Sequence, residues 1–162
     1  MIIPAAVLVA LSAYLLQGDV WTFWTWYLLA LVLGVAAMPL TGRLFRRFDD
    51  KGWIFSKVTA IAITGFLTWF LVTVKILKFT AVTCVAVTVI CTVLSILLYR
   101  KEQKDGFECI PFAHLNLVYA EELLFFAFFL MWPYFAGFHP AAYGTEKFMD
   151  YGFMEAMMRS KT

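Results

Sequence analysis

Two acidic side chains near the end of the chain have a spacing that could support chemistry. Glu146 and Asp150 are four residues apart in the stretch 146–150 (EKFMD), so on a helix they share one face. Two carboxylates placed in this way can bind a divalent metal ion through oxygen ligands, or one of them can act as a general base. The spacing alone favours a plainer interpretation, a solvated acidic face beside Lys147, because an acidic pair one turn apart is a weak signal.

A second acidic pair lies inside a long apolar run. Glu121 and Glu122 are adjacent within residues 112–136, and a carboxylate in a membrane span must be protonated, paired or exposed to a wet cavity. Adjacent helical residues differ by about 100° in direction, so we expect at least one of the two to face the bundle interior. Two interpretations stay open: a polar cavity with a proton or ion site, or hydrogen bonds that hold the spans together. His114 shares the face of Glu121 nearer the inner interface, where we expect a polar cap.

The composition is that of an integral membrane protein. The chain has 162 residues, of which 63% are hydrophobic and 15% charged, with a mean hydropathy of +0.82. Soluble domains are about half apolar and about one quarter charged. The net charge is only +2, and the basic residues form short clusters between apolar runs. We therefore expect a lipid bilayer and no nucleic acid as partner.

The apolar runs predict an all-α, polytopic bundle of transmembrane helices in the cell membrane, because a spanning helix needs about 20 apolar residues. The five predicted spans are residues 2–16, 20–40, 53–74, 79–99 and 112–136. The first run is short, and a re-entrant or surface segment is the alternative there. Residues 1–136 would form the bundle, and residues 137–162 an outer loop and a helix.

Basic residues in short loops predict the orientation, since such loops stay in the cytoplasm. Residues 43–51 and 100–104 carry these clusters, which places the tail 137–162 outside the cell. Trp53 would then lie at the inner start of a span and Trp132 at the outer end of the last one. Both positions suit aromatic anchors at the membrane interface.

The tail itself has the pattern of an amphipathic helix. Thr145 can cap its start, and apolar side chains then alternate with polar ones up to Arg159. Such a helix lies on a membrane surface with its apolar side in the lipid.

Several of these segments resemble one family of prokaryotic membrane proteins, the YYY family. They are residues 121–129 (EELLFFAFF), Pro140, 144–153 (GTEKFMDYGF) and 159–160 (RS), with 146–150 the most specific part. Upstream, residues 34–40 and 50–52 also fit the start of that family.

The resemblance implies a function. Members of the family look like GT-C glycosyltransferases, which take sugars from polyprenyl-phosphate donors at the outer leaflet. In that class an acidic motif in the first outer loop supplies catalysis and often metal binding. By analogy, Glu146 and Asp150 would be the base or the ligands of a divalent metal ion. Arg159 would contact a phosphate or merely continue the helix.

The chain departs from the family in two ways. The resemblance implies an arginine shortly before Pro140, but residues 134–139 contain none, so either His139 replaces it or a contact to the donor phosphate is lost. The chain also stops at Thr162, where the family continues into further spans. We therefore expect the N-terminal membrane part of a glycosyltransferase, inactive alone and completed by a partner membrane subunit. A non-catalytic scaffold or subunit, or a small transporter subunit with ion sites at Glu121 and Glu122, are the alternatives.

Overall fold

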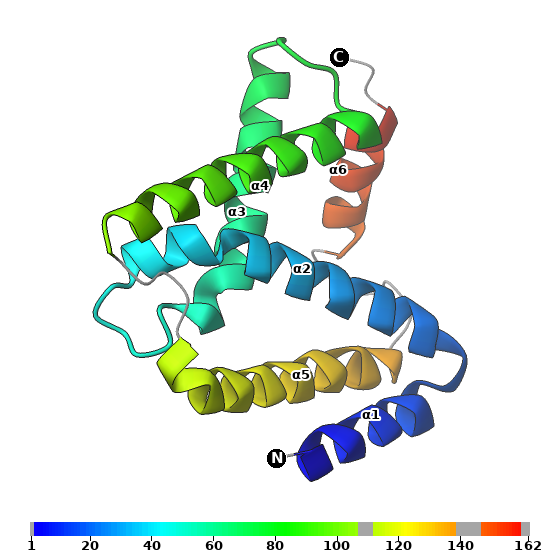
Figure 1. Ribbon diagram of the computed structural model, residues 1–162. Coiled ribbons are helices and arrows are strands. Elements are labelled where there is room, and N and C mark those ends of the chain that lie inside the picture. The colour runs from blue at the N-terminus through cyan, green and yellow to red at the C-terminus, as the bar shows by residue number, and fades with distance from the viewer. Residues whose placement is uncertain (1, 107–111, 139–146, 160–162) are drawn as a thin grey trace.

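The computed structural model describes residues 2–106, 112–138 and 147–159, and every regular element within these ranges is a helix. In chain order the elements are α1 (Ile2–Leu16), η1 (Gln17–Asp19), α2 (Val20–Leu44), α3 (Trp53–Thr73), α4 (Ala81–Lys104), η2 (Phe112–His114), α5 (Leu115–Gly137) and α6 (Lys147–Arg159) (Figure 1). Among these described residues, four helical stretches are long and apolar enough to cross a membrane: Ile3–Leu44, Trp53–Thr73, Ala81–Lys104 and Phe112–Gly137. The predicted all-α membrane bundle is confirmed, and the chain is a multi-pass membrane protein.

The first of these stretches is bent into two arms. Gln17 has a φ of 43°, and the short helix η1 reverses the chain between α1 and α2. As a result α1 returns along α5, as Figure 1 shows. The helix α1 has the predicted bounds and contains 15 residues. At about 1.5 Å per residue it is roughly 22 Å long, which is less than the hydrocarbon thickness of about 30 Å.

One end of the bundle collects the basic loops. Arg43 at the end of α2 and Arg46 just after it each lie 3.2 Å from a carboxylate oxygen of Glu102, near the end of α4. Glu102 is buried, so this carboxylate ties together the two loops that carry the basic clusters. We call residues 43–52 and 100–106 the basic end. Its cytoplasmic orientation stays a prediction.

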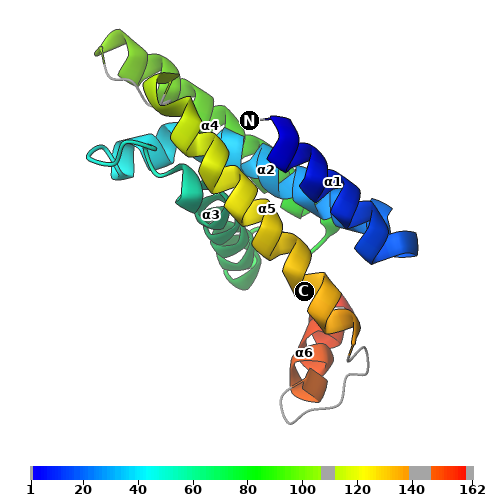
Figure 2. The ribbon, with the colours of Figure 1, turned by 90° about the horizontal axis from the view of Figure 1, so that it is seen from below.

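The opposite end, which we call the far end, consists of η1, the end of α5 and residues 74–80. A cavity there is lined by Leu16 and Asp19 together with Trp132 and Pro133, which places η1 beside the last turns of α5. The helix α6 lies near this end, close to the start of α4 and away from the basic loops (Figure 2).

Aromatic packing fixes α5 against α2. Phe126 is buried and packs edge-on against Phe23 and Tyr27, with ring centroids 5.4 and 4.8 Å apart. Leu130, one turn later, completes this cluster. Edge-to-face pairs of this kind each add about 1 kcal/mol beyond the burial of apolar area. The register they set turns the preceding helical turn of α5, which carries Glu122, toward α2 and α3.

Candidate functional site

The first predicted site lies on α6. Asp150 is exposed in the first turn of this helix, while Glu146, Thr145 and His139 lie outside the described residues. Arg159 ends the helix and forms an ion pair with Glu155, one turn before it. The described part of the predicted site therefore consists of the exposed carboxylate of Asp150 and of Arg159, which is already paired with Glu155.

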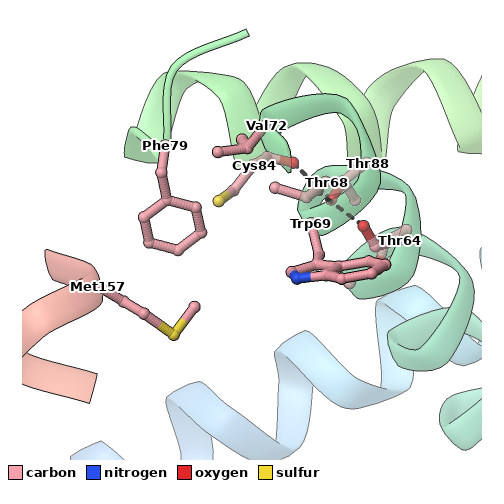
Figure 3. Close-up of a pocket in the computed structure, with 9 residues that line it drawn as sticks. Thr64, Thr68, Trp69, Val72, Phe79, Cys84, Thr88 and Met157 are labelled. Carbon is pink, nitrogen blue, oxygen red and sulfur yellow. Dashed lines mark hydrogen bonds between the residues drawn. The ribbon is translucent and has the colours of Figure 1, made fainter. Parts of the chain in front are cut away.

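A cavity of about 390 Å³ separates α6 from α3 and α4 near the far end (Figure 3). Figure 3 shows Met157 extending from α6 toward the side chains of Phe79 and Trp69. Thr68 and Thr88 donate their hydroxyls to carbonyls of their own helices, each over 2.8 Å, so their polarity is already satisfied. The remaining lining residues are Thr64, Gly65, Val72 and Cys84. The cavity therefore offers a largely apolar wall.

His114 does not act as a side-chain cap of α5, and its place near the inner interface stays a prediction. It ends η2, occupies the N-cap position of α5 and is exposed. Its side chain makes no capping hydrogen bond.

The strongest constellation is built around Glu122, inside the bundle and toward its basic end. The Glu122 carboxylate accepts three hydrogen bonds from three different side chains on two other helices. Tyr27 of α2 donates its hydroxyl to Oε1 over 2.7 Å. Trp53 and Lys57 of α3 donate to Oε2 over 3.0 and 2.6 Å. Bonds to a charged acceptor are roughly twice as strong as neutral ones, so Glu122 binds α5 to both α2 and α3.

Lys57 is enclosed on all sides by this arrangement. Only 3% of its side chain is exposed, and its Nζ lies 4.6 Å from the ring centroid of Trp53 and 4.5 Å from that of Phe125. Such cation–π contacts strengthen when water is excluded. The stem passes against Gly34 of α2, where an added Cβ would lie 2.8 Å from Lys57 Cγ. Gly34 therefore allows the close approach of α2 and α3 that admits the lysine.

Trp53 corrects the prediction of an interfacial anchor. Its side chain is buried and its indole N–H is committed to Glu122. The reason is that its ring packs against Lys57 and its indole reaches Glu122 of α5, so it faces the bundle interior. Trp132, by contrast, is 76% exposed at the far end, a position that suits an aromatic belt.

Glu121 points to a different neighbour than Glu122, as the helical geometry predicts. Its carboxyl group interacts with Asp50, which lies three residues before α3 begins, and more weakly with Lys57. Asp50 is 4% exposed, and its Oδ2 accepts from the backbone N–H of Ile54 over 3.4 Å. Glu121 Oε2 is fully buried and has no hydrogen-bond partner among the described residues.

Glu122 also borders a cavity of about 310 Å³ between α1, α2 and α5. Tyr27 and Tyr119 contribute to its wall, and apolar residues such as Leu8 and Phe126 supply the rest. The partnered carboxylate of Glu122 therefore lies beside open space between these helices.

Sequence reasoning found the two glutamates but not their partners. Lys57 could have been predicted as a partner, because an ionisable residue at the fifth position of a predicted span needs an opposite charge. Glu121 and Glu122 are the acidic residues inside another predicted span. Asp50 and Gly34 entered only through the family resemblance. Tyr27 had no signal, since a tyrosine in an aromatic-rich span is usual. The structure gathers all of these around the paired glutamates, and Asp150 stands apart on α6.

Comparison with known proteins gives one informative result. No curated protein matches the chain, and no solved structure matches it. The family model described as "Uncharacterized membrane protein (DUF2298)" matches residues 63–162. This range begins in the middle of α3 and includes α4, α5 and α6. The chain therefore belongs to the DUF2298 family of membrane proteins.

Proposed function

We propose that this chain is the membrane part of a GT-C-like glycosyltransferase that uses a sugar linked to polyprenyl phosphate at the outer leaflet. The resemblance of residues 121–129 and 144–153 to the YYY family motivates the proposal. The observation that carries it is the place of Asp150, exposed on α6 near the end of the bundle opposite the basic loops. If the basic end is cytoplasmic, Asp150 lies on the side where such donors are used.

In this mechanism a carboxylate activates the acceptor. Glu146 or Asp150 accepts the proton of an acceptor hydroxyl as its oxygen attacks the anomeric carbon of the sugar. The bond from that carbon to the phosphate oxygen breaks, and the phosphate leaves with the electron pair. Positive charge near the leaving phosphate lowers the barrier, a role for Arg159 if it exchanges Glu155 for the donor, with His139 as the second candidate.

A divalent metal ion is the other source of such charge. Among residues 2–106, 112–138 and 147–159, no group of three or more His, Cys, Asp or Glu side chains is arranged to hold a metal ion. The described residues contribute only Asp150 to the predicted metal site, so no step is assigned to a metal here.

The cavity beside Met157 supports the lipid part of the proposal. It lies near the same end as Asp150, and its wall is largely apolar because its threonine hydroxyls bond to their own helices. A largely apolar wall is compatible with a polyprenyl chain whose phosphate is held at the membrane surface.

The test has two stages, both with the whole protein in its native membrane. Single cysteines at Asp150 and at Arg47, in a chain whose three native cysteines are replaced, are treated in intact cells with a membrane-impermeant maleimide. We expect labelling at position 150 and none at position 47 until the cells are opened. Labelling of position 47 alone in intact cells would invert the topology and remove the main support for the proposal.

The second stage compares Asp150→Asn with Glu155→Gln. Both substitutions remove one carboxylate from α6. Asp150 is a proposed base, whereas Glu155 only pairs with Arg159 and would have to release it for the donor. We expect Asp150→Asn to reduce sugar transfer from a polyprenyl-phosphate donor at least 100-fold, and Glu155→Gln to leave most of it. Equal activity of the two variants would contradict the assignment.

A second function is favoured by the partners of Glu122. The three hydrogen bonds from Tyr27, Trp53 and Lys57 are what a carboxylate with a structural role requires. They support a non-catalytic scaffold, with α6 as the docking helix for a partner membrane subunit. In that case Asp150→Asn is neutral, and loss of the exposed methionines of α6 releases the partner from the purified complex. If the chain is a transporter subunit, substitution of Glu121 or Glu122 would abolish its function. The labelling and sugar-transfer experiments would then both give negative results.

A further inference from the structure

The carboxyl groups of Asp50 and Glu121 form a contact that has no donor as long as both are ionised. A carboxylate is only an acceptor of hydrogen bonds, whereas a protonated carboxyl group is also a donor. Glu121 interacts with Asp50, yet its buried Oε2 has no donor among the described residues. Leaving a buried acceptor unsatisfied costs about 1–3 kcal/mol, and more for a charged one.

The surrounding charges do not neutralise both groups. From α3, Lys57 interacts with Glu121 but makes its short ion pair with Glu122, at 2.6 Å. From α2, the Tyr27 hydroxyl also donates to Glu122.

Two loop cations near Asp50 in sequence are Arg46 and Lys51, and neither of them is buried. Arg46 pairs with Glu102, and the Nζ of Lys51 donates to the carbonyl of Arg46. Three buried or half-buried carboxylates thus meet one buried ammonium group, that of Lys57.

A proton resolves both the missing donor and the excess negative charge. Two carboxylates in contact at a buried site cannot both ionise without strong repulsion, and one shared proton turns the repulsion into a hydrogen bond. A multivalent metal ion is a poorer fit, because no group of three or more possible ligands is assembled anywhere in the described residues.

We propose that Asp50 and Glu121 form a proton-binding site in which the Glu121 carboxyl group donates its proton to the carboxylate of Asp50. The site joins the loop before α3 to α5, beside the ion pair of Lys57 and Glu122. It is independent of the proposed glycosyltransferase activity, since it lies among α3, α5 and the loop rather than on α6.

The experiment is infrared difference spectroscopy of the whole purified chain in nanodiscs of phosphatidylcholine and phosphatidylglycerol at neutral pH. Exchange from water to D₂O reveals the C=O stretch of a protonated carboxyl group. The variants are Glu121→Gln, whose amide can donate to Asp50 without the proton, and Asp50→Asn, whose amide donates to Glu121 and lets it ionise. The matched control is Asp49→Asn, because Asp49 is the adjacent residue and is exposed.

We expect the band in the wild type and in Asp49→Asn, and its loss in both Glu121→Gln and Asp50→Asn. A wild type without the band overturns the proposal, as does a band that persists in both site variants. Loss in only one of the two variants, or loss in the control, rules out a shared proton as well. Glu121→Gln preserves shape and hydrogen bonding, so it decides the question even if Asp50→Asn fails to fold.

Discussion

The ammonium group of Lys57 and the carboxylate of Glu122 meet at 2.6 Å although the two residues are 65 positions apart in the chain. This contact joins α3 to α5 within a bundle whose outer faces are largely apolar. Charged side chains inside a bilayer are tolerated when they pair with one another. Here the pairing is supplemented by Tyr27, by Trp53 and by the close approach of α2 at Gly34.

Breaking this pair from one side should be costly. We expect Lys57→Met to lower the free energy of unfolding by about 3–5 kcal/mol, because it leaves the Glu122 carboxylate buried without its counter-charge. Denaturation with SDS from mixed micelles measures the change.

The double variant Lys57→Met, Glu122→Leu tests the cause. It removes both charges together, and replacing a whole buried ion pair by apolar residues is often close to neutral. We expect it to recover most of the lost stability. If the double variant is less stable than Lys57→Met by the full effect of Glu122→Leu, the two residues are not coupled.

Gly34 and Gly65 provide a matched pair of helix glycines. Alanine is favoured over glycine in a helix by about 1 kcal/mol. An added Cβ at Gly34 would lie 2.8 Å from Lys57 Cγ and 2.9 Å from Ser56 Oγ, whereas at Gly65 nothing lies within 4 Å. We expect Gly34→Ala to lower the melting temperature in detergent and Gly65→Ala to raise or preserve it. A stabilising Gly34→Ala would mean that α2 and α3 are not in close contact there.

The sequence predicts the helices well because their signal is local. A run of apolar residues of bilayer length defines each span, and the bounds of α1 are the predicted ones. The same local pattern does not predict which side chains contact Glu122. Lys57 and Trp53 reach Glu122 only because α3 and α5 cross near the basic end, and that crossing depends on Gly34 and on the packing of Phe126 with Tyr27. Pairings between residues about 70 positions apart leave no periodic pattern in one sequence.

Trp53 and Trp69 separate a buried tryptophan from a lipid-facing one on the same helix. Trp53 is 9% exposed and donates to Glu122, whereas Trp69 is 54% exposed. We expect Trp53→Phe to cost about 1.5–3 kcal/mol of unfolding free energy, the range for a hydrogen bond to a charged acceptor. We expect Trp69→Phe to cost less than about 0.5 kcal/mol. Equal effects in the same SDS titration would place Trp53 at the lipid interface after all.

Gly52 and Gly106 distinguish backbone strain from steric clash. Their φ values are 76° and 75°, in the left-handed region where a residue other than glycine pays about 1–2 kcal/mol. A Cβ at Gly52 would lie 2.5 Å from the ring of Phe45, while at Gly106 nothing lies within 4 Å. Gly106→Ala should therefore show the strain alone, and Gly52→Ala the strain plus displacement of Phe45 from its stacking on Phe55.

Gly52 adjoins Trp53, so the clash should also disturb the hydrogen bond from Trp53 to Glu122. We expect Gly52→Ala to be more destabilising than Gly106→Ala by at least about 1 kcal/mol. Thermal unfolding of both variants, followed by tryptophan fluorescence, measures the difference, and indistinguishable melting temperatures would show that the loop 45–52 does not hold α3 in place.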